Sequence, residues 1–287
     1  MSLPGLTICL GITVVMELLF AGPALAWGPA VHTVTALNVL DDVRALLPEI
    51  SKIITTSPLQ YLYGCLAADF FIGKGRPGVS GHPHNWEGGF RFLREAEGDR
   101  ESAFAYGFLS HLAADVVAHN FFVPTMMGSM RHRKRRGHLY WEVRADYLMG
   151  PDYIRIARDV LTMDHKGCDD LLALISGKGG NGLKTKKRIF TQSVKFSDYL
   201  YTAHPLLFSG KAVRRKDFQM YLALMVGISC RLVKDFLGNP HSSPCLSYDP
   251  MGKAALRQAK RKWPLGRPLN RCRSIRRSAL DRGSIVL

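Results

Sequence analysis

One stretch constrains the fold of this chain more than any other: an apolar run from Ala103 to Phe122 that carries ionisable side chains in a single register. His111, Asp115 and His119 are spaced i, i+4, i+8, so on an α-helix they lie along one stripe, about 6 Å apart per step. Burying such groups without a counter-charge costs several kcal/mol for each of them. The run therefore predicts a buried helix whose polar stripe faces a divalent metal ion.

The same helical periodicity recurs along most of the chain, whereas period-two alternation is almost absent. Gly and Pro gather between the periodic segments, where helices are expected to stop. We predict an all-α fold, a single multi-helix domain of roughly eight helices over residues 27–250. The expected helical segments are Val31 to Leu47, Leu59 to Phe71, Phe90 to Ala96, Ala103 to Phe122, Leu139 to Met149, Ile154 to Leu161 and Phe218 to Leu237.

The N-terminal segment predicts export. Residues 3–26 are apolar apart from Glu17 and end in Ala-Leu-Ala, so residues 1–26 are interpreted as a signal peptide cut between Ala26 and Trp27. The product would be periplasmic or secreted. Because no Lys or Arg precedes the apolar run, an uncut membrane anchor is the alternative.

The other end of the chain is strongly basic. Residues 253–282 hold eleven Lys or Arg against one Asp, which accounts for most of the net charge of +16. We interpret residues 251–287 as a disordered, solvated tail; attraction to an anionic membrane surface and a nucleic-acid arm are the alternatives.

Several further patterns favour no special chemistry. The loop "GKGGNGLKT", residues 177–185, is interpreted as a flexible linker, since Leu183 stands where a phosphate loop needs Lys. The basic run at residues 131–136 is either a solvated face or an attractor of phosphate. The five cysteines that follow the leader lack CxxC pairs, which excludes a disulfide framework and a thiolate zinc site.

More nitrogen and oxygen donors lie outside the central run. His138, Glu142 and Asp146 repeat the i, i+4 spacing on a second helix, and two such helices packed face to face would share a metal pocket. Taken singly, each His is as readily a core histidine and each pair a surface contact. Upstream stand His32 and Asp69, and a Gly/Pro loop supplies His82 and His84; zinc accepts all of these donors.

In chain order, these donors resemble the bacterial zinc-dependent phospholipase C family, which shares its fold with fungal single-strand-specific zinc nucleases. The resemblance covers roughly Trp27 to Leu148. It implies an all-α domain that holds up to three zinc ions, one of them chelated by the α-amine and carbonyl oxygen of an N-terminal Trp exposed by signal cleavage. The matching donors are Trp27, His32, Asp69, His84, His111, Asp115, His119, His138 and Glu142.

The resemblance also implies a role for each donor. Trp27, His32 and Asp115 would hold one zinc ion. Asp115 would bridge to a second ion held by Asp69, His84 and His111. His119, His138 and Glu142 would hold the third. His84 is preferred to His82 because "HNWE" looks like the family's His followed by an aromatic and an acidic residue.

The chain departs from the family at one point. Three residues separate Asp115 from His119, where the toxin-type phospholipases and the nucleases have five, so His119 is expected to stay on the same continuous helix. The third zinc site is the least secure for this reason, with His132 and Asp146 as substitute ligands.

The implied activity is that of phospholipase C: a zinc-activated water would cleave a phospholipid and release diacylglycerol and a phosphorylated head group. Asp69 would act as the general base. The "AYGFLSHLAADVVAHNFF" context favours this lipid branch. The alternatives are a single-strand nuclease on the same trinuclear site, with bases stacked on Trp86, Tyr140 or Trp141, and a zinc-binding protein without catalysis.

Overall fold

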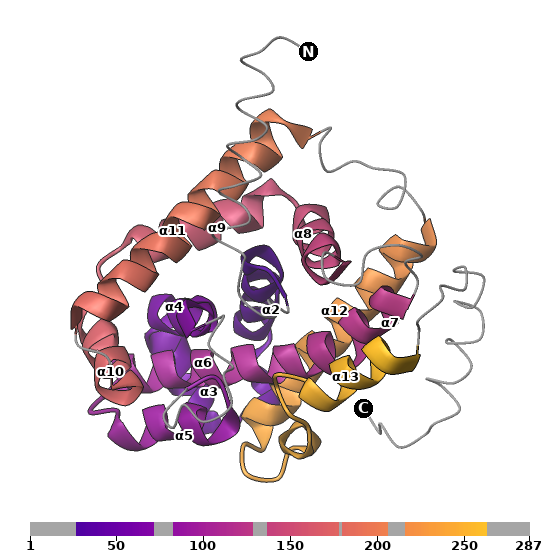
Figure 1. The fold of residues 1–287 in the computed structure, drawn as a ribbon. Helices are drawn as coiled ribbons and strands as arrows, with labels where there is room; N and C mark the ends of the chain where they lie inside the picture. The colour runs from indigo at the N-terminus through magenta and orange to yellow at the C-terminus, as the bar shows by residue number, and fades with distance from the viewer. Residues whose placement is uncertain (1–26, 72–82, 129–136, 178–179, 206–215, 263–287) are drawn as a thin grey trace.

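The computed structural model describes residues 27–71, 83–128, 137–177, 180–205 and 216–262, and every regular element within these ranges is helical (Figure 1). The predicted all-α class is therefore confirmed. The leader, His82, His132 and the basic run at 131–136 lie outside the described residues.

Helix α2 (Pro29–Asp41) lies at the centre of the fold (Figure 1). Its neighbours are α4 (Pro58–Ala67), α6 (Asp99–Val117), α8 (Gly137–Met149), α9 (Pro151–Thr162) and α12 (Lys216–Gly238). Small and apolar residues surround its axis, from Ala30 to Val39, and a helix that is apolar on all sides is expected to be buried. The chain therefore carries His32 into the interior of the protein.

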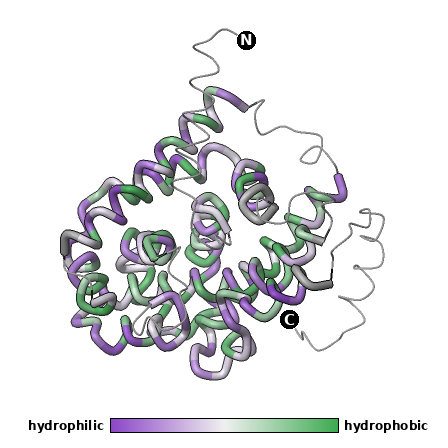
Figure 2. Tube along the Cα trace, in the orientation of Figure 1, coloured by the Kyte–Doolittle hydropathy of each residue, from purple (hydrophilic) through white to green (hydrophobic). Residues whose placement is uncertain are grey.

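The remaining elements pack around this centre. They are η1 (Val43–Ala45), α3 (Pro48–Thr56), η2 (Ala68–Phe71), α5 (Trp86–Glu95), the π-turn η3 (Ala118–Phe122), α7 (Val123–Gly128), α10 (Lys166–Ser176), α11 (Gly180–Ala203), η5 (Pro244–Ser247) and α13 (Lys253–Lys262). Figure 2 shows α6 as largely apolar, whereas hydrophilic and hydrophobic positions alternate along α11 on the outside of the fold.

Two glycines let α4 and α6 approach closely. A Cβ atom on Gly64 would lie 2.0 Å from the carbonyl oxygen of Phe104, and a Cβ on Gly107 would lie 2.1 Å from that of Tyr61. Any larger side chain at either position would force the two backbones apart. This contact matters for function because α6 carries two of the predicted ligands and the segment after α4 carries a third.

Local sequence signals set several helix boundaries. Proline occupies the first turn of α2, α3, α4 and α9, where its missing N–H costs nothing. The Asn85 side chain caps α5 by accepting a hydrogen bond from the Gly88 N–H at 2.8 Å. This cap fixes the position of Asn85, the residue that follows His84.

Some predicted helices are divided or extended in the structure. The segment from Val31 to Leu47 ends as an α-helix at Asp41, because Asp42 leaves helical geometry and Pro48 begins a new helix. The segment from Leu59 to Phe71 ends in the 3₁₀ turn η2. Helix α11 begins at Gly180, so the linker predicted for residues 177–185 is wrong from that residue onward.

The expected tail differs in its first part. Residues Lys253–Lys262 form helix α13, which packs against α7 and η3, whereas the sequence predicted disorder from residue 251. The apolar residues within the Lys-rich segment explain the difference, since Leu256 packs against the core and Ala259 is buried. Residues 263–287 lie outside the described residues.

Two findings concern the environment of the fold. Over the part of the chain that the structure describes, no helix combines the length and the apolar character needed to cross a bilayer. Cys65, Cys168, Cys230 and Cys245 are buried free thiols, in agreement with the expected lack of a disulfide framework.

Candidate metal centre

Five separate elements bring six predicted donors into one buried cluster. The donors are at most 5% exposed. They are His32 from α2, Asp69 from η2, His84 from the residues before α5, His111 and Asp115 from α6, and His119 from the π-turn η3. Donors up to 87 residues apart in the sequence (119 − 32) are thus gathered in the core.

Asp115 lies at the middle of this cluster. Its Oδ1 atom lies 3.3 Å from His32 Nε2. Its Oδ2 atom lies 3.3 Å from His111 Nε2 and 3.4 Å from His84 Nε2. The two oxygens of one carboxylate therefore face two different sets of imidazoles, which is the arrangement a bridging ligand requires.

The imidazoles around Asp115 also set its charge. Burial by itself would raise the pKa of Asp115, but the facing rings of His111, His32 and His84 outweigh that effect and hold the pKa well below its usual range. Asp115 is therefore a carboxylate rather than a carboxylic acid, as a metal ligand must be.

His111 is oriented by the backbone of α4. Its Nδ1 atom donates a hydrogen bond to the Cys65 carbonyl oxygen at 2.8 Å. Because a carbonyl can only accept, Nδ1 carries a proton, so Nε2 is the nitrogen that the neutral ring would offer to a metal. The Nε2 atom points into the cluster, 3.0 Å from His84 Nε2, and the His111 ring stacks on His32 at 3.9 Å between centroids.

Asp69 completes the cluster from the side of η2. Its Oδ1 atom lies 3.6 Å from His111 Nε2, while its Oδ2 atom is buried without a hydrogen-bond partner. Burial raises the pKa of Asp69 well above its usual range; His111 lowers it in part, and the nearby carboxylates of Asp115, Glu142 and Asp146 raise it further. Several carboxylates are thus close enough to repel one another, and a cation would relieve this repulsion.

His119 reaches the cluster through a change of helix type. Helix α6 ends at Val117, and residues Ala118–Phe122 form a single π-turn. The chain stays helical through this turn into α7, with Ala118 and Val123 in right-handed helical geometry. The prediction that His119 stays on one continuous helix is therefore confirmed, whereas the π-turn within it was not predicted. The Nε2 atom of His119 lies 3.8 Å from Asp115 Oδ2. Turns of the π type are frequent at functional sites, because the extra residue redirects a side chain.

The spacing of the donors fits zinc. Two ligand atoms of a tetrahedral zinc ion at bond lengths of about 2.0–2.1 Å lie roughly 3.3 Å apart. The distances from Asp115 Oδ2 to His111 and His84 match this value, and the ligand atoms of His84, His111 and Asp115 form one group within 4.8 Å. His32, Asp69 and His111 form a second such group. His32 Nε2, Asp69 Oδ2 and Asp115 Oδ1 are buried without hydrogen-bond partners, as expected for atoms that receive a metal.

Helix α8 contributes two buried carboxylates. Glu142 is buried and close enough to influence Asp69 electrostatically. Asp146, a substitute ligand in the sequence analysis, instead accepts hydrogen bonds from the Ala30 and Val31 N–H groups at 2.7 and 3.1 Å. It therefore anchors the N-terminus of α2 through these two hydrogen bonds. The side chain of His138 lies outside the described residues.

Trp27 is fixed just ahead of α2. Its side chain is fully buried, donates a hydrogen bond from Nε1 to Ser229 Oγ at 3.1 Å and packs on Phe122 at 4.6 Å between ring centroids. The Gly28 carbonyl accepts a hydrogen bond from the His32 N–H at 3.1 Å. Trp27 therefore directly precedes the helical turn that carries His32.

Sequence reasoning did not find the residues that support these donors. The Cys65 carbonyl and Ser229 carry no local signal, because a backbone oxygen and a lone serine are recognised only by what packs against them. Gly252 is a third case: it adopts φ +55°, and a Cβ there would lie 2.5 Å from the His119 carbonyl oxygen. A glycine is needed at this point both for the conformation and for the approach.

An all-helical fold around a buried cluster of imidazoles and carboxylates with zinc spacing is typical of helical metalloenzymes. The family profile described as zinc dependent phospholipase C matches residues 31–178, which is 148 of the 287 residues. The chain belongs to the zinc-dependent phospholipase C family, an enzyme family of phosphoric diester hydrolases that act on phospholipids. No curated protein and no solved structure matches the chain.

The match confirms the family predicted from the sequence and supports Zn²⁺ as the metal. Eight of the nine predicted donors fall within the matched residues, and Trp27 lies four residues before them.

Proposed function

We propose that the protein is an exported phospholipase C that cleaves the phosphodiester on the glycerol side and releases diacylglycerol and a phosphorylated head group. The observation that carries this proposal is the central position of Asp115, with one oxygen toward His32 and the other toward His84 and His111. Such a carboxylate suits two adjacent metal ions, and clustered divalent ions are the catalysts of phosphodiester hydrolysis.

The donors would divide into three sets. His84, His111, Asp69 and Asp115 would hold one ion, and Asp115 would also serve a second ion with His32 and the α-amine and carbonyl of Trp27. His119, His138 and Glu142 would hold a third. When bound, zinc supplies a nucleophilic water at neutral pH and stabilises charge on the phosphoryl oxygens.

The protein groups around this site have their own tasks. The Cys65 carbonyl keeps His111 in the tautomer that presents Nε2. Asp69 turns one oxygen toward His111 and leaves Oδ2 without a hydrogen bond, which suits it to orient the attacking water and take its proton. The low exposure of the cluster excludes bulk water and strengthens each electrostatic contact.

Export and activation are coupled in this proposal. Cleavage after Ala26 would turn the Trp27 nitrogen from an amide, which has no lone pair to donate, into an amine. The buried indole, held by Ser229, would fix this new terminus close to His32. An uncut chain would keep the leader and lack this ligand.

The nuclease alternative has weaker support. Trp86 donates its Nε1–H to the Tyr248 carbonyl at 2.8 Å and stacks on Phe236. Trp141 is buried against Phe218. Trp141 is therefore used in packing and Trp86 is half-buried, whereas a nuclease needs exposed ring faces for its bases. The third candidate aromatic, Tyr140, has its side chain outside the described residues.

The test uses the full-length gene product recovered from the culture supernatant or periplasm. Its first residue is sequenced, its zinc content is measured, and it is incubated with phosphatidylcholine and separately with single-stranded DNA, with and without a chelator. We expect Trp27 at the N-terminus, release of phosphocholine that the chelator abolishes, and recovery of activity on adding zinc. Nucleotide release without lipid cleavage would support the nuclease, and zinc binding without either activity would support a non-catalytic protein.

A further inference from the structure

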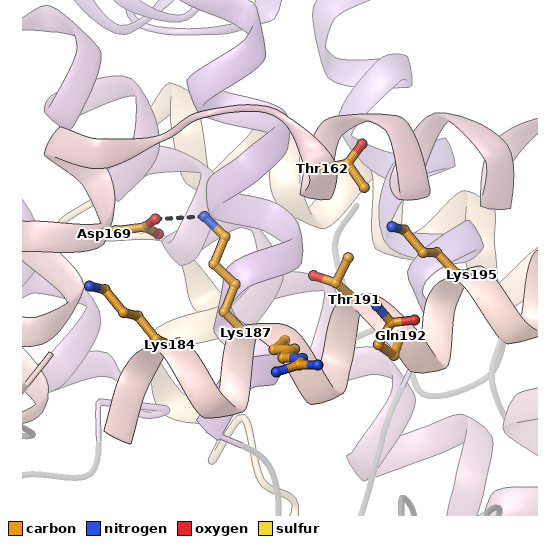
Figure 3. A pocket seen from close by; sticks show the side chains of 8 residues that line it. Thr162, Asp169, Lys184, Lys187, Thr191, Gln192 and Lys195 are labelled. Carbon is orange, nitrogen blue, oxygen red and sulfur yellow. Dashed lines mark hydrogen bonds and ion pairs between the residues drawn. The ribbon is translucent and has the colours of Figure 1, made fainter. Parts of the chain in front are cut away.

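A groove separate from the metal centre is lined mainly by basic and polar side chains. It lies between α11, the end of α9 and the start of α10, has a volume of about 450 Å³, and is shown in Figure 3. Four basic side chains line it: Lys184, Lys187, Arg188 and Lys195. None of the six described donors of the metal centre contributes to it.

The basic residues share one face of α11. Lys184, Lys187, Arg188 and Lys195 stand at positions i, i+3, i+4 and i+11, which return to the same side of a helix. Figure 3 shows the Lys187 side chain extending from α11 toward Asp169 and the Lys195 side chain toward Thr162 at the end of α9, with Thr191 between the two lysines. The groove thus gathers cations on both sides of a hydroxyl.

The single carboxylate of the groove is already satisfied. The Oδ1 atom of Asp169 accepts a hydrogen bond from the Tyr63 hydroxyl. Its Oδ2 atom forms an ion pair with Lys187 Nζ at 2.6 Å. Lys187 also lies over the Tyr63 ring, 4.9 Å from its centroid. Asp169 therefore neutralises and positions Lys187, while Lys184, Arg188 and Lys195 make no ion pair with a described residue and leave a net positive charge.

Thr191 supplies an independent observation that points to a ligand. Its side chain is 8% exposed, and its hydroxyl is buried without a hydrogen-bond partner. Other hydroxyls inside helices of this protein donate to the carbonyl four residues earlier: Thr33 to Pro29 at 2.8 Å, Thr35 to Val31 at 3.0 Å and Ser229 to Met225 at 3.0 Å. A buried hydroxyl left without such a bond costs free energy unless something else occupies it.

We propose that this groove binds a phosphate group. Phosphate oxygens accept charge-assisted hydrogen bonds from Lys and Arg, and one of them would accept from the Thr191 hydroxyl. The volume of about 450 Å³ lies in the range of small-ligand sites and exceeds the size of one phosphate, so the group can belong to a larger molecule. The two sources of this chemistry are a free phosphate and the phosphate of a lipid head group.

The site does not depend on the proposed reaction. It contains no cluster of His and carboxylate donors among its lining residues, so it holds a ligand rather than a metal. Its binding is measured without turnover, and its failure would leave the hydrolase proposal intact.

The test uses the zinc-loaded, full-length protein and three variants. The first, Lys184→Gln/Arg188→Gln/Lys195→Gln, removes three exposed charges of the groove and keeps the Lys187 to Asp169 pair. Its matched control, Lys52→Gln/Arg94→Gln/Arg257→Gln, removes three exposed charges from α3, α5 and α13. The third, Thr191→Val, removes only the buried hydroxyl in a nearly equal volume.

Two binding assays separate the sources. Calorimetric titration with inorganic phosphate measures the free anion. Flotation with vesicles of a neutral galactolipid, with or without phosphatidic acid, measures the head group; these lipids carry no phosphodiester, so the metal centre has nothing to cleave. A free-phosphate site saturates in the first assay, whereas a lipid site responds to phosphatidic acid alone.

We expect the groove variant to weaken binding by roughly tenfold or more relative to the matched control in at least one assay, with the effect reduced by salt. Thr191→Val should weaken the same binding by roughly fivefold to tenfold without lowering thermal stability, since its hydroxyl has no partner within the protein. Equal binding by the groove variant and its control in both assays would overturn the proposal. Unchanged binding by Thr191→Val would also contradict the proposal, because the Thr191 hydroxyl would then not contact the phosphate.

Discussion

The Nε2 atom of His32 lies 3.3 Å from Oδ1 of Asp115, although the two residues are 83 positions apart (115 − 32). His32 comes from the central helix α2 and Asp115 from the C-terminal end of α6. The pair joins the two sides of the cluster, because the other oxygen of Asp115 faces His84 and His111. The loss of Asp115 should therefore affect both sides at once.

Asp115→Ala is predicted to lower the zinc content by two ions and to reduce phospholipase activity by more than about 100-fold, since even the loss of a supporting residue at a metal site costs 10- to 100-fold. Zinc per chain, measured by elemental analysis, checks this. Asp99→Ala, the same change at the exposed start of α6, is the control and should leave zinc unchanged. Full zinc content in Asp115→Ala would contradict the bridging role.

The choice between the two histidines of the loop is tested by their alanine variants. His84 lies 3.0 Å from His111 and 3.4 Å from Asp115 through its Nε2 atom, so His84→Ala should lose one zinc ion and most activity. His82→Ala should retain both. Zinc content and rate of lipid hydrolysis are compared side by side, and the opposite pattern would assign the ligand to His82.

Gly107→Ala is predicted to destabilise the protein by about 1–3 kcal/mol or more, because the new methyl group meets the Tyr61 carbonyl oxygen and pushes α4 from α6. Gly227→Ala, also inside a helix but with open space around the new atom, should stabilise by about 0.5–1 kcal/mol. Chemical denaturation of the two variants gives both free energies. Equal effects would show that helix propensity, rather than packing, governs Gly107.

We expect Asp146 to make the free energy of unfolding depend on pH. Burial raises the pKa of Asp146 from 3.8 to about 7, so folding takes up a proton between these values. The contribution of this residue to the free energy of unfolding is present at acid pH and is lost as the pH rises toward about 7.

Asp146→Asn keeps an oxygen for the Ala30 and Val31 N–H groups but cannot ionise. The midpoint of urea denaturation, measured at several pH values from 5 to 8, should fall less steeply with rising pH in this variant than in the unchanged protein. The same slope in both proteins would show that Asp146 does not titrate in this range.

Much of the fold was predictable because helical periodicity is a local property. The apolar stripes around His111 and Glu142 predicted α6 and α8 within a few residues of their ends. Helix α11 was not predicted, since its buried residues, among them Leu183 and Val194, are diluted by the lysines of its exposed face. A helix with mostly polar residues is positioned by the few apolar side chains that it packs against the rest of the fold.

The sequence predicted which residues form the metal centre but not how these residues contact one another. The i, i+4, i+8 register places His111, Asp115 and His119 on one side, yet it predicts neither the π-turn at His119 nor the close approach of Gly252 to the His119 carbonyl. Asp146 has the spacing of a ligand and is used instead to anchor α2. Nothing within its own helix distinguishes these two roles.

The sequence by itself determined the all-helical class, the family and the donors on each helix, because spacing along a helix fixes which side chains share a face. The tertiary structure decided that Asp115 turns one oxygen to His32 and the other to His111, and that the Cys65 carbonyl orients His111 from 46 residues away. These relationships arise where helices distant in the chain meet, and a contact between helices depends on how closely their backbones approach rather than on the residues next to it in sequence.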